Sequence, residues 1–111
     1  MVEQNPTPLA LDVTVAPDGP TVMVACELDM ASVEALVDVA GREISGPTRR
    51  LTIDLSGVLF CDSSGINGLV RLRNQCAEQG WDFRLVHLPR DLHRLISDLT
   101  GLREFLGIAD Y

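Results

Sequence analysis

One stretch of the chain constrains the fold more than any other: the strand-like sequence LTIDLSGV leads through LFCDS into the helical pattern SGINGLVRLRNQCAEQG. Residues 51–55 have the apolar pattern of a buried strand, which we expect to end in a Ser-Gly turn at 56–57. From about Ser64 to Gln79, apolar side chains recur on one helix face, and Gly80 provides a helix end. A buried strand that passes directly into a long amphipathic helix is typical of a sheet packed by helices, so the sequence predicts an α/β fold.

Segments on both sides add further strands and helices. Residues 9–17 and 21–28 are two apolar segments joined by the turn-forming sequence PDGP, so we expect them to form a hairpin. The second segment is apolar on both faces and should be an inner strand. The order ββαβαβα(β) predicts one mixed sheet of about four to five strands packed by three to four helices. The remaining expected elements are a helix over 30–45 capped by Asp29, a strand over 81–88, a helix over 89–99, and one more turn and a short final strand within 102–111.

Length and composition fit one domain. The chain has 111 residues, 46% of them apolar, which is enough to build a core without disulfides. Residues 1–8 are polar and include Pro6 and Pro8, so we expect a flexible tail before a single domain over 9–111. The first residues lack the basic and apolar regions of a signal peptide, and no apolar run approaches the ~20 residues of a membrane span. A cytoplasmic location is therefore expected.

The charge distribution restricts the partners. The formal net charge is −7, and no basic run is longer than Arg49-Arg50. Nucleic acids and anionic membranes are not expected partners, because both require clustered positive charge on the protein. An acidic chain should instead be attracted to a protein that carries a basic surface.

The three cysteines are expected to be reduced. Cys26, Cys61 and Cys76 are odd in number and show no CxxC spacing. Each lies in an apolar segment, where a free cysteine packs as a small hydrophobic residue. Cys61 adjoins the polar junction and is therefore kept as a possible redox site.

The junction CDSSG, residues 61–65, contains two serines that could attack a substrate, cap the helix or carry a phosphate. A nucleophilic serine at a strand–helix turn usually has the sequence GxSxG, and the first glycine is missing here. The two histidines, His87 and His93, are expected to be surface residues rather than catalytic bases. Neither a metal-ligand spacing nor a glycine-rich phosphate loop is present. We therefore expect no enzyme activity, no cofactor and no small-molecule substrate.

Capping and phosphorylation remain, and they are compatible. A serine hydroxyl before the first turn would accept a hydrogen bond from a free amide, and the same amides and the helix dipole favour a phosphate. A phosphoserine would add about −1.5 to −2 charges beside Asp62. That charge would alter an interaction at the surface without disturbing a core.

Three sequence blocks resemble STAS-domain anti-sigma factor antagonists. LTIDLSGVLFCDSSGINGLVRL resembles the family signature, in which an apolar strand containing DLS leads into DSSG and a helix. ACELDMASVEAL resembles the earlier GELD segment, although Cys26 replaces the glycine, and LTGLREFLGI resembles the late LTGL segment. The blocks occur in the family's order and span about Leu9 to Ile108. The resemblance implies the STAS fold for nearly the whole chain.

The resemblance also implies a regulatory role through partner switching. In this family the unphosphorylated antagonist binds an anti-sigma factor with a histidine-kinase-like ATPase fold, and a sigma factor is released. That partner phosphorylates the first serine of DSSG, here Ser63 with Ser64 as second choice, and a PP2C-type phosphatase removes the phosphate. The residues that carry over to the partner surface are Glu27, Asp29, Asp62, Ser63, Ser64, Gly65 and Asn67.

A second hypothesis keeps the fold but not the switch. The domain would then be an accessory or scaffold subunit of a larger assembly, such as a lipid-transport complex or a signalling scaffold. In that case Ser63 would only cap the helix, and no cognate kinase would phosphorylate it.

Overall fold

The computed structural model describes residues 10–97, so the expected tail and the expected final strand lie outside the described residues. Its elements follow the predicted order of strands and helices. They are β1 (Ala10–Ala16), β2 (Gly19–Leu28), α1 (Val33–Arg42), β3 (Arg50–Cys61), α2 (Ser63–Gln79), β4 (Asp82–Val86) and α3 (Arg90–Ser97).

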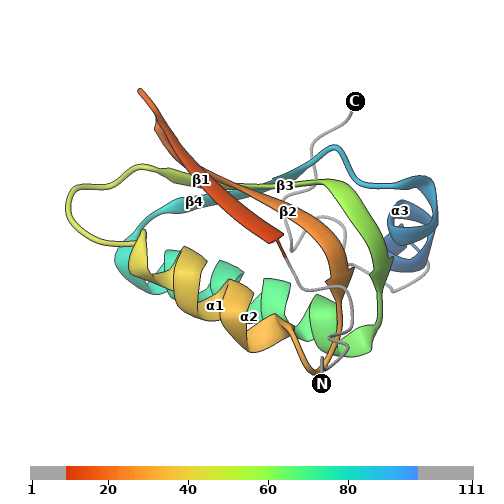
Figure 1. Ribbon diagram of the computed structural model, residues 1–111. Coiled ribbons are helices and arrows are strands. Elements are labelled where there is room, and N and C mark those ends of the chain that lie inside the picture. The colour runs from red at the N-terminus through yellow and green to blue at the C-terminus, as the bar shows by residue number, and fades with distance from the viewer. Residues whose placement is uncertain (1–9, 98–111) are drawn as a thin grey trace, which may run out of the picture.

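The four described strands form one mixed sheet in the order β1-β2-β3-β4, which confirms the predicted fold class. β1 and β2 are antiparallel, as expected for a hairpin, whereas β2, β3 and β4 are parallel to one another. Each parallel connection must return the chain to the same end of the sheet, and α1 and α2 make these returns. Figure 1 shows both helices packed under one face of the sheet. No helix within residues 10–97 is long and apolar enough to cross a membrane.

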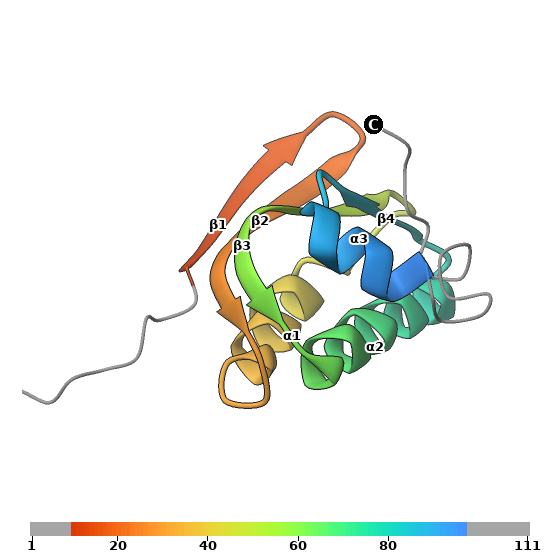
Figure 2. The ribbon, with the colours of Figure 1, turned by 90° about the vertical axis from the view of Figure 1, so that its right-hand side faces the viewer.

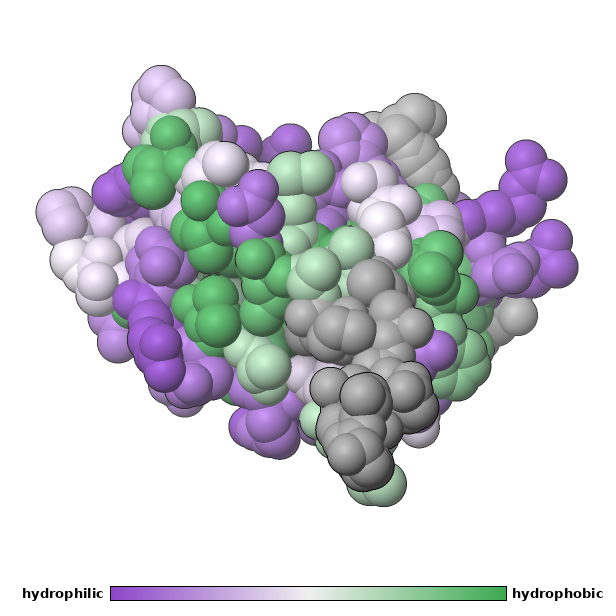
Figure 3. Space-filling model, viewed as in Figure 1, coloured by the Kyte–Doolittle hydropathy of each residue, from purple (hydrophilic) through white to green (hydrophobic). Residues whose placement is uncertain are grey.

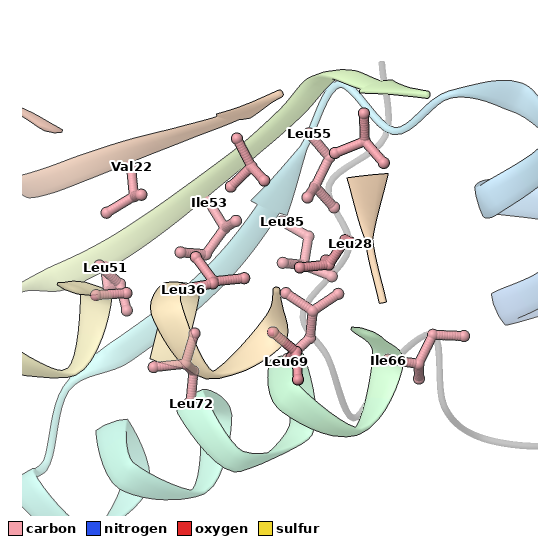
Figure 4. Packing of buried hydrophobic residues seen from close by; sticks show 14 of the residues in the cluster. Val22, Leu28, Leu36, Leu51, Ile53, Leu55, Ile66, Leu69, Leu72 and Leu85 are labelled. Atoms are coloured by element: carbon pink, nitrogen blue, oxygen red, sulfur yellow. The ribbon is translucent and has the colours of Figure 1, made fainter. Parts of the chain in front are cut away.

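The hydrophobic core lies between this sheet face and the two helices (Figure 4). In β3, the alternating residues Leu51, Ile53 and Leu55 are fully buried. From α2, Leu69 and Leu72 point into the same space. The core also contains Val22, Val24, Leu28, Val33, Leu36, Ala40, Ile44, Val58, Ile66, Cys76, Trp81, Leu85, Leu88, Leu92 and Ile96. The apolar faces expected for α1 and α2 are thus confirmed, except that Ala77 near the end of α2 is exposed. In α3, Leu92 and Ile96 are buried, but Leu95, which was expected on the same apolar stripe, is exposed.

β3 is longer than expected, and the predicted turn at Ser56-Gly57 is wrong. The strand continues to Cys61, and its register with β2 shifts between Met23 and Ala25 and again between Cys26 and Glu27. A Cβ on Gly57 would lie 2.8 Å from the Cβ of Ala25. The glycine is therefore needed where two strands approach closely, and not for a turn.

The helices α1 and α2 are held together by close packing and by polar contacts. A Cβ on Gly68 would lie 2.2 Å from Cγ2 of Val33, so a glycine is needed where the helices approach. Beside this contact, the Arg71 guanidinium donates to both carboxylate oxygens of Glu34 at 2.7 and 3.2 Å. This packing fixes the position of the α1 N-terminus relative to the start of α2.

Candidate functional site

The serine junction lies at the point where β3 passes into α2, with only Asp62 between them. Asp62 has an extended backbone, and its carboxylate accepts hydrogen bonds from the amides of Ser64 at 2.9 Å and Gly65 at 3.2 Å. The helix cap is therefore the aspartate, and the expectation that a serine provides it is wrong. A carboxylate is the stronger acceptor at a helix N-terminus, because it also interacts favourably with the helix dipole.

The two serines differ in accessibility. Ser63 is the first residue of α2 and is exposed, whereas Ser64 is only partly accessible. Because the cap is supplied by Asp62, the Ser63 hydroxyl can be modified without loss of the helix start.

The loop after β2 lies beside this junction. The amide of Asp62 donates to the carbonyl of Leu28 at 3.3 Å, which connects the ends of the two parallel strands. In the loop, Asp29 Oδ1 accepts from the amides of Ala31 and Ser32, and Ser32 Oγ donates to the carbonyl of Glu27 at 2.8 Å. The acids Glu27, Asp29 and Asp62 are thus gathered at one edge of the sheet, because parallel strands end on the same side.

Asp29 acts differently from the simple cap that was expected. The first residue of α1 is Val33, and Asp29 organises the turn that precedes it. The amides of Ser32 and Val33 both donate to the Asp29 carbonyl. The helix therefore begins later than the expected residue 30, and Asp29 stabilises the turn that leads into it.

A groove of about 450 Å³ begins at Ser63 and runs between α1 and α2. Asn67, one of the predicted partner-binding residues, is exposed one turn after Ser63 and lines it. Sequence reasoning assigned no partner role to four other lining residues: Met30, Val33, Glu34 and Arg71. The Glu34–Arg71 pair joins residues 37 positions apart, and no local pattern reports such a contact.

The ion pair also sets the electrostatics of the groove. The hydrogen bond and charge of Arg71 hold the pKa of Glu34 below its ordinary value, and Glu34 raises the pKa of Arg71 in return. Both side chains are therefore charged at neutral pH. Arg71 neutralises Glu34, so the ion pair adds no net charge to the lining of the groove.

Gly65 is buried, so it contributes to packing rather than to a direct partner contact. A Cβ at this position would lie 2.7 Å from Cys61 Sγ and 2.7 Å from the carbonyl oxygen of Leu28. A backbone oxygen cannot be displaced without moving the strand. The glycine therefore lets the start of α2 rest against the ends of β2 and β3.

The described thiols are poorly suited to redox chemistry. Burial, together with the negative charge of Asp62, raises the pKa of Cys61 to about 12. Burial likewise raises the pKa of Cys76 to about 11. Since the thiolate is the reactive form, both cysteines are almost entirely protonated at neutral pH, which disfavours the redox role considered for Cys61.

The described side-chain contact of His87 is with an acid and not with a serine. His87 Nδ1 lies 3.0 Å from Asp54 Oδ2, so its described partner is a carboxylate in the middle of β3. Among residues 10–97, no group of three or more His, Cys, Asp or Glu side chains is placed to hold a metal ion.

Comparison with known proteins places this arrangement in a family. The family model described as "Mlab, STAS domain" matches residues 11–107. The chain belongs to the STAS domain family. No curated protein sequence matches this STAS domain.

Solved structures with the same fold include regulators and a transporter. An anti-sigma factor antagonist from Mycobacterium paratuberculosis is 28% identical, with a TM-score of 0.78 over 93% of this chain and 86% of that one. The anti-sigma factor antagonist SpoIIAA in its unphosphorylated form is 16% identical, with a TM-score of 0.66 over 92% and 89% of the two chains. The murine anion transporter Slc26a9 is 21% identical, with a TM-score of 0.63 over 91% of this chain but 20% of the transporter.

Proposed function

We propose that this STAS domain is an anti-sigma factor antagonist that is switched off by phosphorylation of Ser63. The observation that carries the proposal is the exposed Ser63 hydroxyl at the N-terminus of α2, next to a cap that does not depend on it. The 28% identity to an anti-sigma factor antagonist over 93% of the chain supports the same function.

The partner would be an anti-sigma factor with a histidine-kinase-like ATPase fold. It would bind the edge formed by Glu27, Asp29 and Asp62, where an acidic surface favours a basic one. Ser63, Ser64 and Asn67 would lie within the same contact. Binding would free the sigma factor, and because sigma factors act on transcription this role places the chain in the cytoplasm.

Phosphorylation would act on the surface and not on the core. The partner's own kinase activity would add about −1.5 to −2 charges at Ser63, beside the carboxylate of Asp62, and would thereby change the charge and the hydrogen bonding of the contact. A PP2C-type phosphatase would reverse the modification. Ser64 is the less suitable acceptor because it is less accessible. The antagonist itself would be a substrate and a binding module, without enzyme activity.

The test compares three variants as baits in cell extract of the source organism, with captured proteins identified by mass. Ser63→Ala should retain an anti-sigma factor in the presence of ATP, and Ser63→Glu should lose at least tenfold in affinity for it. Ser64→Ala is the matched control and should still take up one phosphate. If Ser63→Ala and Ser63→Glu both bind like the wild type, the switch does not exist.

The alternative role, a subunit of a larger assembly without a switch, also has support. The STAS fold forms part of the much longer anion transporter Slc26a9. Intact-mass measurement with ATP and the captured partner separates the two roles. Addition of one phosphate to the wild type and none to Ser63→Ala supports the switch, whereas no addition to either supports the assembly role.

A further inference from the structure

Large apolar side chains are exposed close to the serine junction. Leu59 and Phe60, near the end of β3, are 80% and 53% exposed, and Leu95 of α3 is 40% exposed. In Figure 3, hydrophobic side chains reach the surface at the end of the molecule where β2 and β3 end in Figure 1. Clustered apolar exposure on a small acidic domain usually marks an interaction surface.

These residues border a groove of about 280 Å³ between β3 and α3. β4 pairs only with Arg50–Asp54, so the rest of β3 is not hydrogen-bonded to β4. Figure 2 shows α3 beside this part of β3, and the groove lies between them. The lining is almost entirely apolar: Val58, Leu59, Phe60, Cys61, Pro89, Asp91, Leu92 and Leu95.

We infer that the partner that recognises Ser63 inserts an apolar side chain into this β3–α3 groove, with Phe60 as the main anchor. The inference rests on the proposed function and extends its contact surface. Ser63 is three residues after Phe60, at most about 10 Å of extended chain. A standard interface buries about 800 Å² on each partner, which corresponds to a radius of about 16 Å. A partner centred on Ser63 therefore covers Phe60.

The charges around the groove define the chemistry of that partner segment. Among the described residues that line the groove, Asp91 alone carries a charge. Glu27 lies opposite Phe60 in the β2–β3 pairing, and Asp62 is two residues after Phe60 in the chain. The complementary surface is an apolar anchor flanked by Lys or Arg, because basic side chains at the rim would pair with these acids.

This placement explains how one phosphate could prevent binding without any refolding. Met30 is 76% exposed and lines the other groove at Ser63, on the α1 side. A partner that contacts both Met30 and the Leu59–Phe60 pair would also cover Ser63, which lines the groove with Met30 and follows Phe60 by three residues. A phosphate there would have to be desolvated against apolar partner side chains, which is unfavourable.

The inference is tested with Phe60→Ser and Leu95→Ser, and with Val15→Ser as the matched control. Val15 is 70% exposed on β1, so its loss removes a similar apolar surface from another part of the sheet. Affinity is measured with the purified anti-sigma factor captured by Ser63→Ala. Phe60→Ser should bind about thirtyfold more weakly, Leu95→Ser several-fold more weakly, and Val15→Ser like the wild type. The thermal unfolding midpoints of all three should stay near that of the wild type.

Other results would overturn the inference. If Phe60→Ser binds with wild-type affinity while Ser63→Glu still loses affinity, the partner does not use the groove. The proposed function is then left intact. Unchanged affinity with a lowered unfolding midpoint means that the chain itself fills the groove. Self-association of the wild type that Phe60→Ser abolishes assigns the groove to a second copy. A Ser63→Ala bait that captures no anti-sigma factor refutes the proposed function and this inference together.

Discussion

Asp62 and Ser63 are neighbours in the sequence and have separate roles at the start of α2. The carboxylate of Asp62 holds two amides of the first turn, and the hydroxyl of Ser63 remains exposed. Sequence reasoning identified the junction but expected a serine to cap the helix, although Asp is an equally favoured cap. The backbone direction at the end of β3 decides between the two, because it places the Asp62 carboxylate over the helix.

A second aspartate, Asp54 in β3, should make stability depend on pH. Burial alone would raise its pKa, but the amide of Ser56 and the ring of His87 bond to the carboxylate and hold the pKa below the ordinary 3.8. The stabilisation is present above that ordinary value and is lost as the pH falls toward the lowered one. Asp54→Asn should therefore cost about 1 kcal/mol at pH 7 and progressively less below pH 3.8, measured by urea unfolding.

The control for this prediction is Asp12→Asn. Asp12 lies on β1 and is exposed, so its replacement should change the free energy of unfolding little at either pH. A difference between wild type and Asp54→Asn that stays constant from pH 7 to strongly acidic pH would contradict the electrostatic explanation.

At the scale of elements, the contact between α1 and α2 depends on Gly68. Alanine normally stabilises a helix interior relative to glycine by about 0.5–1 kcal/mol. Here the new methyl group would meet Val33 at 2.2 Å, and valine is conformationally stiff, so the helices must separate. Gly68→Ala should therefore destabilise the protein by about 1–3 kcal/mol in urea unfolding.

A double-mutant cycle gives the matched comparison. Val33→Ala removes the methyl group that Gly68→Ala would strike, so the double variant should lose less stability than the sum of the single variants. Asn74→Ala, at an exposed position of the same helix, should be neutral or slightly stabilising. Strictly additive effects would mean that the two residues do not meet.

At the scale of the whole molecule, the net charge of −7 should govern the rate of association. If the partner surface is basic, as proposed, long-range attraction accelerates encounter and salt screens it. The association rate constant should fall about tenfold or more between about 20 mM and 300 mM salt in stopped-flow measurements. Phe60→Ser should instead mainly raise the dissociation rate, because short-range anchors act after encounter. An association rate that does not respond to salt would contradict a basic partner surface.

The sequence by itself determined the α/β class, the order of the elements and the strand–helix junction that carries Ser63. Each of these depends on local patterns: alternation in strands, helical spacing of apolar residues, and polar or glycine residues at the ends. The boundaries of β3 and α1 were less well predicted. A glycine that signals a turn in isolation, Gly57, instead permits close strand packing once β2 lies beside it.

Only the tertiary structure decided what surrounds Ser63. The groove that contains Glu34 and Arg71 lies between the helices α1 and α2. The β3–α3 groove lies between a strand and a helix that are far apart in the sequence. Phe60 is exposed in a part of β3 that β4 does not pair with. Such features depend on contacts between residues far apart in the chain, and local propensities carry no information about them.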